Sequence, residues 1–250
     1  MAGVVKQEGT EVALTALTTS MLLPLIKPGA RVAACGYPDM IAPLDLMERL
    51  LGVRFGALKY RPDSDRICKR HGLKPRRIPD AQSVFDMLDA KLDVFDIVQE
   101  RGDEILCDLN DTFPYRFIGA AIERYDFVLD VGTLEHCFNI GQAAVNMAGL
   151  LKAGGIIFHG NPHCSGNHGF YGIQPTWYAD FYGQDGFELL YCKLMVRGSD
   201  EPLDVPRTAR FSIGAREVNI FATARRNEIK PIIWPQQTKY KGAPHGNQPE

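Results

Sequence analysis

Polar side chains follow an apolar segment in the middle of the chain, and their types suit acid–base chemistry. The segment Asp126–Val131 is predicted to form a buried strand, and Thr133-Leu134-Glu135-His136 follows it directly. A carboxylate and an imidazole at a strand end can orient a substrate or line a binding pocket. We therefore predict that Glu135 and His136 take part in catalysis. A buried His136 with a purely structural hydrogen bond is the alternative.

A second group of such residues lies in the segment 161–182, which is rich in Asn, His, Gly and aromatic residues. Aromatic faces together with Asn and His donors suit a hydroxylated ligand such as a sugar. The imidazole pKa is close to neutral, so a histidine beside a hydroxyl can act as a general base. His168 is our first candidate for this base and His163 is the second. The alternative is a packed aromatic loop with structurally bonded histidines.

The residues between these two groups predict the elements that would position them. Apolar residues at helical spacing predict a helix over about Gly141–Lys152, and Gly154 would end it. The next predicted strand is Ile156–His159. A strand–helix–strand unit of this kind forms parallel strands, and ligands bind beyond their C-terminal ends. Both polar groups are therefore expected at one edge of one sheet.

The rest of the chain predicts further elements of an α/β protein. A helix over about Glu11–Leu25 precedes a buried strand at Arg31–Cys35, and Gly36 opens the turn after that strand. The other predicted elements are helices at Leu44–Leu51 and Ser83–Lys91, a helix that starts at Pro175, and strands at Leu92–Ile97, Glu104–Asp108, Phe187–Val196 and Glu217–Arg225.

Several of these segments resemble the class I S-adenosylmethionine (SAM)-dependent methyltransferases. Members often have an Asp at the start of the fourth strand, here Asp126, and a Leu-Glu-His group after it, here 134–136. They also have a Leu-Lys-Pro-Gly-Gly turn, which reads Leu-Lys-Ala-Gly-Gly at 151–155. The segment 168–178 reads His-Gly-Phe-Tyr-x-x-x-Pro-x-x-Tyr and is similar to a subgroup associated with glycan and secondary-metabolite pathways. The resemblance covers about Met21–Arg225.

The resemblance implies a fold and a cofactor. The fold is α/β, with a Rossmann-like, doubly wound sheet of seven mostly parallel strands and an antiparallel edge strand. The cofactor is SAM, with Asp96 accepting the ribose hydroxyls and with Asp108 and Leu109 contacting the adenine. The other implied cofactor contacts come from the turn after the first strand and from the end of the fourth: Gly36, Tyr37, Asp39, Asp130 and Thr133.

The turn after the first strand departs from the family pattern. Ala34 stands where an acidic residue is usual, and Pro38 stands where a second glycine is usual. Proline fixes φ and has no N–H to offer to the methionine carboxylate of the cofactor. We interpret Asp39 as a partial substitute that holds the methionine ammonium. Loss of cofactor binding is the alternative.

The activity implied by the resemblance is methyl transfer from SAM to the hydroxyl of a small molecule, most simply a sugar or a glycan precursor. Two alternatives stay open. One is methylation of a nitrogen, or of an oxygen on a metabolite that is not a sugar. The other is a degenerate, non-catalytic methyltransferase fold that binds a partner protein.

The sequence predicts no metal ion. Some magnesium-dependent methyltransferases use a Glu-x-x-Glu-His group, but Gly132 stands at the place of the first Glu, so one oxygen ligand is missing. His163, Cys164 and His168 offer only three donors, two of them adjacent, which does not suit zinc. The six cysteines form no Cys-x-x-Cys pair and indicate a reducing compartment.

Composition and charge limit the partners. The 250 residues have a net charge of −2, which gives no general attraction to nucleic acid or to anionic membranes. No apolar run reaches membrane-spanning length and no signal pattern is present, so we expect a cytoplasmic protein with a hydroxylated small-molecule substrate. A homo-oligomer is left open. The basic segments 69–71 and 74–77 are either solvated loop charge or contacts to an anionic substrate.

The domain organisation is predicted from composition shifts. Residues 1–228 would form the methyltransferase-like domain, and 229–250 would form a C-terminal tail rich in Pro, Gln and Gly. The polar, basic and proline-containing segment 53–79 would be an insertion beside the site. We interpret it as a lid or substrate-recognition arm, with a plain surface excursion as the alternative.

Overall fold

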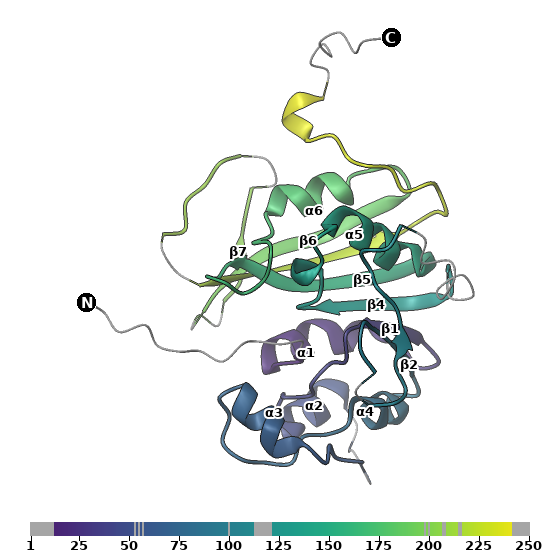
Figure 1. Cartoon of the computed structure of the whole chain (residues 1–250), viewed down its shortest axis with the longest axis vertical. Coiled ribbons are helices and arrows are strands. Elements are labelled where there is room, and N and C mark those ends of the chain that lie inside the picture. Colours follow the sequence, from purple (N-terminus) through teal and green to yellow (C-terminus); the bar gives the residue numbers. More distant parts are fainter. Residues whose placement is uncertain are drawn as a thin grey trace.

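The structure is a computed structural model with one central sheet and helices on both faces of it (Figure 1). It describes residues 13–241 except 53, 55, 57, 100, 113–121, 198, 200, 207–208 and 215–216. No helix in the described ranges has the length and apolar character that a membrane crossing needs.

The sheet has eight strands in the order β3-β2-β1-β4-β5-β8-β6-β7. The strands from β3 to β5 pair in parallel, whereas β8 runs antiparallel to both β5 and β6, and β7 runs antiparallel to β6. The bounds of the strands are β1 Arg31–Cys35, β2 Lys91–Asp96, β3 Ile105–Leu106, β4 Tyr125–Val131, β5 Leu151–Cys164, β6 Phe187–Val196, β7 Leu203–Asp204 and β8 Val218–Arg226.

The helices cover the two faces of the sheet in two groups (Figure 1). Along β1, Ala33 and Cys35 pack into the core under α5 and α6, whereas Val32 and Ala34 pack into the core under α1, α2 and α4. Both faces are therefore buried, as a parallel sheet requires. The bounds of the helices are α1 Ala16–Leu22, α2 Leu44–Leu51, α3 Ser64–Arg70, α4 Ala81–Met87, α5 Ile140–Gly149 and α6 Pro175–Phe181, with shorter 3-10 helices at Leu23–Leu25, Leu134–His136 and Thr238–Tyr240.

The predicted fold class is confirmed, with two differences in the sheet. The short β7 raises the number of strands to eight, because two residues of the segment after β6 pair with Lys193 and Leu194. The predicted antiparallel edge strand is present as β7, and a second antiparallel strand, β8, lies inside the sheet between β5 and β6. Strand order reverses between β1 and β4, which are neighbours in the sheet. In open α/β sheets this reversal marks the place where ligands bind, beyond the C-terminal strand ends.

Several predicted element boundaries were wrong. The helix predicted at Ser83–Lys91 is α4, which ends at Met87, and the strand predicted at Glu104–Asp108 is the two-residue β3. Within the described residues the first helix starts at Ala16, where the Thr15 side chain caps it by accepting from the N–H of Thr18, and a 3-10 helix continues it to the predicted end at Leu25. The predicted start at Glu11 lies outside the described residues. The helix predicted over Gly141–Lys152 ends at Gly149, and Lys152 belongs to β5, where it forms an ion pair with Asp126. Strand pairing with β4 therefore overrides the helical spacing of those residues.

Strand β5 is much longer than the predicted Ile156–His159. It includes the double glycine, because the register with β4 shifts between Tyr125 and Phe127. Gly154 has φ +80° and sits in this irregular stretch of the strand and not at a helix end. At the other end β5 continues through Pro162 to Cys164, with a second shift opposite β8. Strand β5 therefore continues beyond the edge of the sheet at which the candidate site was predicted.

The segments predicted as insertion and tail both contact the rest of the chain. The insertion contains α3, whose Ile67 and Cys68 pack with Ile78 in a small core against which Ile41, outside the insertion, also packs. Ile232, which follows β8, packs against the core under α5 and α6. The backbone N–H of Thr238 lies 3.2 Å from both carboxylate oxygens of Asp180 on α6. The domain boundaries themselves stay a prediction.

We expect Gly155→Ala to lower the free energy of unfolding by about 1–3 kcal/mol, the usual cost of overpacking. A Cβ at this position would lie 2.9 Å from the carbonyl oxygen of Tyr125 and 3.0 Å from that of Lys152, and backbone cannot rotate away. The control is Gly149→Ala, where a Cβ meets nothing within 4 Å and helix propensity improves. Urea denaturation of both variants checks this. Equal stability of the two variants would contradict the packing at the start of β5.

Candidate functional site

A cavity of about 480 Å³ opens beyond the C-terminal ends of β4 and β5. Val131 and Gly132 at the end of β4 line it, together with Gly160, Asn161 and Pro162 of β5. Its other walls come from the N-terminal part of α1 and from the end of α3. The volume lies in the range of small-molecule sites, and the place is next to the strand-order reversal. We therefore treat this cavity as the candidate site.

A fully buried hydrogen-bonded chain joins β4, β5 and α6 beneath the cavity. Asp130 Oδ2 lies 2.6 Å from His159 Nδ1, and His159 Nε2 lies 2.6 Å from the hydroxyl of Tyr182. Burial, followed by the charge of Asp130, raises the pKa of Tyr182 well above its usual value, so its hydroxyl keeps its proton and donates. His159 then accepts at Nε2 and donates from Nδ1 to Asp130. The imidazole is thereby fixed in one tautomer.

Asn161 connects this chain to the cavity. Its Nδ2 donates to Asp130 Oδ2 at 3.1 Å and to Glu135 Oε2 at 2.9 Å, while its Oδ1 accepts from the hydroxyl of Tyr178. Asp130 also accepts the backbone N–H groups of Thr133 and Leu134 through Oδ1, both at 3.1 Å. The two carboxylates are 0% exposed, so one amide bridges two buried acids. Asp130, which was predicted to contact the cofactor, therefore uses both carboxylate oxygens in hydrogen bonds to other residues of the chain.

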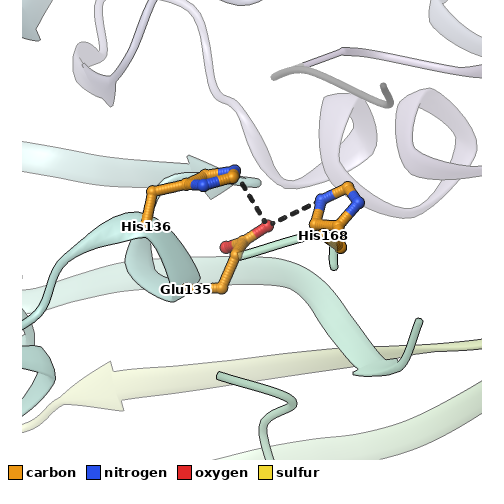
Figure 2. Close-up of side chains that lie close together, drawn as sticks. All are labelled: Glu135, His136 and His168. Atoms are coloured by element: carbon orange, nitrogen blue, oxygen red, sulfur yellow. Dashed lines mark ion pairs between the residues drawn. The ribbon is translucent and has the colours of Figure 1, made fainter. Parts of the chain in front are cut away.

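The side chains of Glu135, His136 and His168 lie close together, as Figure 2 shows. Glu135 Oε1 is 3.3 Å from His168 Nε2 and 3.9 Å from His136 Nε2. Glu135 and His168 line the cavity, and the side chain of His136 is half-exposed beside them. Three of the four predicted catalytic residues are thus brought together, although 31 residues lie between His136 and His168 in the sequence.

Gly169 is the reason that His168 reaches Glu135. The backbone of the 161–182 segment crosses directly over Glu135, where the N–H of Phe170 donates to the Glu135 carbonyl at 2.9 Å. A Cβ on Gly169 would lie 2.9 Å from both Cγ and the carbonyl oxygen of Glu135. Only glycine permits this approach without a shift.

His163, the second predicted base, lies outside this cluster. Its Nδ1 is 2.9 Å from the carbonyl oxygen of Ile173, and its ring stacks on Phe211. Cys137 follows His136 but is an unsuitable nucleophile, because burial and then the charge of Asp130 raise its pKa to about 12.

The turn after β1 is surrounded by cations. Gly36 has φ +82°, which favours glycine at this position. The Arg101 guanidinium lies 4.1 Å from the centroid of the Tyr37 ring. Asp39 is 2% exposed and lies 3.1 Å from His71 Nε2, with Arg70 and Arg101 nitrogens at 3.6 Å. Its Oδ1 is a buried oxygen that accepts no hydrogen bond from the described residues.

The other predicted cofactor residues lie at successive strand ends on the same edge of the sheet. Asp96 ends β2 and accepts the N–H of Val98 through Oδ1 at 3.2 Å. Asp108 and Leu109 follow β3, and Asp108 is exposed. The Thr133 hydroxyl donates to the Cys35 carbonyl, which ties the end of β4 to the end of β1. Within the described residues, none of these four lines the cavity, so their cofactor roles stay predictions.

Sequence reasoning missed three residues at the site, namely His159, Tyr182 and Arg197. His159 and Tyr182 were not singled out, although a histidine in a buried strand is a signal for a polar partner. The cavity also has a basic wall formed by Lys69, Arg70, His71 and Arg197. The first three were noted as a basic cluster of uncertain role, and the distant Arg197 gave no signal in the sequence.

No protein-family model matches the chain, and no curated protein matches it. Among solved structures, the chain is similar to 1,6-didemethyltoxoflavin-N1-methyltransferase of Burkholderia thailandensis, which was solved with bound 1,6-didemethyltoxoflavin and S-adenosylhomocysteine. The two are 14% identical with a TM-score of 0.46, and the match covers 85% of this chain and 78% of that one. A SAM-dependent methyltransferase of Archaeoglobus fulgidus is 13% identical with a TM-score of 0.44, over 83% of this chain and 93% of that one. Because these sequence identities and TM-scores are low, the functional proposal rests on the residues of this chain.

We expect Asn161→Asp to lower the free energy of unfolding by about 3 kcal/mol near neutral pH, because the variant removes the donor between two buried acids. The new carboxylate would have a raised pKa in the folded state, so the folded protein would bind more protons than the unfolded chain. The deficit relative to wild type should therefore shrink as the pH falls. Thermal or urea unfolding at several pH values measures this.

The matched control is Asn227→Asp, at an exposed residue that follows β8. It should change stability by less than about 0.5 kcal/mol at any of these pH values. An Asn161→Asp protein as stable as this control would refute the bridging role of Asn161.

Proposed function

We propose that this chain is a SAM-dependent methyltransferase that methylates a hydroxyl group of a small molecule, with a sugar or glycan precursor as the acceptor class. The observation that carries the proposal is the cavity at the strand-order reversal, where the Glu135–His168 pair lies beside the end of β4. The first-strand turn and the acidic residues of the predicted cofactor site end at the same edge of the sheet.

The donor set fits both ends of the cofactor. Asp96 has lone pairs beyond those used by Val98, so its carboxylate can accept from a ribose diol. The buried Oδ1 of Asp39 supplies an acceptor for the methionine ammonium, and the nearby Arg101 supplies positive charge for the methionine carboxylate. SAM supplies an electrophilic methyl group on a sulfonium centre.

The cavity residues fit the acceptor side of the reaction. The acceptor oxygen attacks the methyl carbon in line with the departing sulfur, so alignment lowers the barrier. Glu135 and His168 line the cavity and would bind the acceptor hydroxyl and activate it for loss of its proton. The basic wall, with Lys69 and Arg197 among its residues, favours an acceptor that carries a phosphate or carboxylate group. A sugar phosphate meets both requirements.

We expect Asp96→Ala to weaken binding of S-adenosylhomocysteine by roughly 1–3 kcal/mol, the cost of losing a hydrogen bond to a charged group. Isothermal titration calorimetry measures this, with Asp103→Ala in the same β2–β3 connection as the exposed control. An unchanged dissociation constant for Asp96→Ala would remove Asp96 from the site. Absence of binding to the wild-type protein at millimolar cofactor would overturn the proposed function and favour a partner-binding protein.

We expect His168→Ala to reduce turnover by about 10²–10⁴-fold, as loss of proton-transfer assistance does, while the affinity for S-adenosylhomocysteine stays close to that of wild type. The assay follows S-adenosylhomocysteine release from SAM with a panel of sugars, sugar phosphates and nucleotide sugars. Full turnover in the variant would exclude a role for His168 in activating the acceptor. An equal loss of cofactor affinity would place it at the cofactor instead.

A further inference from the structure

Three side chains at the cavity present ligand atoms to a common point. One carboxylate oxygen of Glu135 and one ring nitrogen each of His136 and His168 all lie within 4.8 Å of one another (Figure 2). Two donors that bind the same ion at about 2.1 Å can be at most about 4.2 Å apart. The Glu135–His168 and Glu135–His136 distances of 3.3 and 3.9 Å already meet this limit. The half-exposed His136 can rotate to complete the set.

We propose that Glu135, His136 and His168 form a binding site for one divalent transition-metal ion at the wall of the cavity. The sequence alone predicted no metal, because the first carboxylate of a Glu-x-x-Glu-His group is replaced by Gly132. The fold supplies a different third donor, since Gly169 allows the 161–182 segment to bring His168 onto Glu135.

The state of Glu135 is an independent observation that points to a cation. Its side chain is 0% exposed, and Oε1 accepts no hydrogen bond of good geometry within the described part of the chain. A buried charged oxygen in this state is costly unless a cation or a donor compensates it. The other oxygen, Oε2, is held by Asn161, which is itself fixed by Asp130 and Tyr178. Such supporting contacts orient a ligating carboxylate.

The donor types select the class of ion. Two imidazole nitrogens and one carboxylate suit Zn²⁺, Fe²⁺, Co²⁺ or Ni²⁺, whereas Mg²⁺ and Ca²⁺ prefer oxygen ligands throughout. Three protein ligands also leave coordination positions open toward the cavity, as in catalytic sites.

The role of the ion rests on the proposed function. An acceptor hydroxyl that binds a divalent cation loses its proton more readily than a free hydroxyl, which would give the three side chains a single task. His168 would then act as a ligand, and the proton released by the hydroxyl would pass to solvent water at the open side of the cavity and not to His168. Binding of the ion itself does not depend on methyl transfer.

The test is a titration of the full-length, chelator-treated protein with Co²⁺, whose visible d–d absorption reports coordination by protein ligands. We expect one equivalent to bind, Zn²⁺ to displace it, and a large excess of Mg²⁺ to have no effect. Glu135→Gln, His136→Ala and His168→Ala should each weaken Co²⁺ binding by about 100-fold or more, since even residues that only support a ligand contribute about 10–100-fold. The control His163→Ala, in the same segment but bonded to Ile173, should bind Co²⁺ as wild type does.

Two results would overturn the inference: no Co²⁺ or Zn²⁺ bound by the wild-type protein, or binding that survives both Glu135→Gln and His168→Ala. Circular dichroism confirms that each variant is folded, and His136→Ala is the safest of them because that side chain is half-exposed. Calorimetry with S-adenosylhomocysteine on the same samples separates the two proposals. Cofactor binding without metal binding refutes only the metal site, whereas metal binding without cofactor binding refutes only the methyltransferase.

Discussion

Two fully buried carboxylates, Asp130 and Glu135, set the main physical constraint on this structure. Removing a charged group from water is expensive, and the cost is tolerated only where hydrogen bonds and partners replace the lost solvation. Asp130 has four such partners: two backbone N–H groups, His159 and Asn161. These contacts fasten the end of β4 to the neighbouring strand and, through Tyr182, to α6. The edge of the sheet is therefore held rigidly at the point where the cavity opens.

The same contacts explain why the cavity has its shape. Strand β5 continues to Cys164, and this brings Asn161 level with the residues that follow β4. The chain then returns over Glu135 at Gly169, close enough that no other residue would fit without a shift. On the opposite wall, the end of α3 is attached to the β1 turn by the contacts of Arg70 and His71 with Asp39. Each wall is thus fixed by a buried acid.

Local patterns in the sequence predicted the elements well where one effect dominates. The bounds of β1, α2 and β6 agree with the prediction, because apolar residues and their spacing are local signals in these segments. The boundary between α5 and β5 could not be predicted, since it depends on pairing with β4. The same holds for the site. The residue types of Glu135 and His168 indicated chemistry, but their contact depends on a crossing of two segments that only the folded chain shows.

The arrangement around Glu135 is easier to understand as a functional feature than as a stabilising one. An apolar side chain of similar volume would remove the desolvation cost and would often make the protein more stable. Oε2 is compensated by Asn161, but Oε1 faces two imidazoles at the surface of a cavity and not a set of fixed donors. Buried polar atoms without hydrogen-bond partners tend to occur at functional sites, where the stability of the surrounding structure offsets their free-energy cost. The network from Asn161 through Asp130 to His159 and Tyr182 is that surrounding structure here, and it leaves one charged oxygen available at the cavity wall.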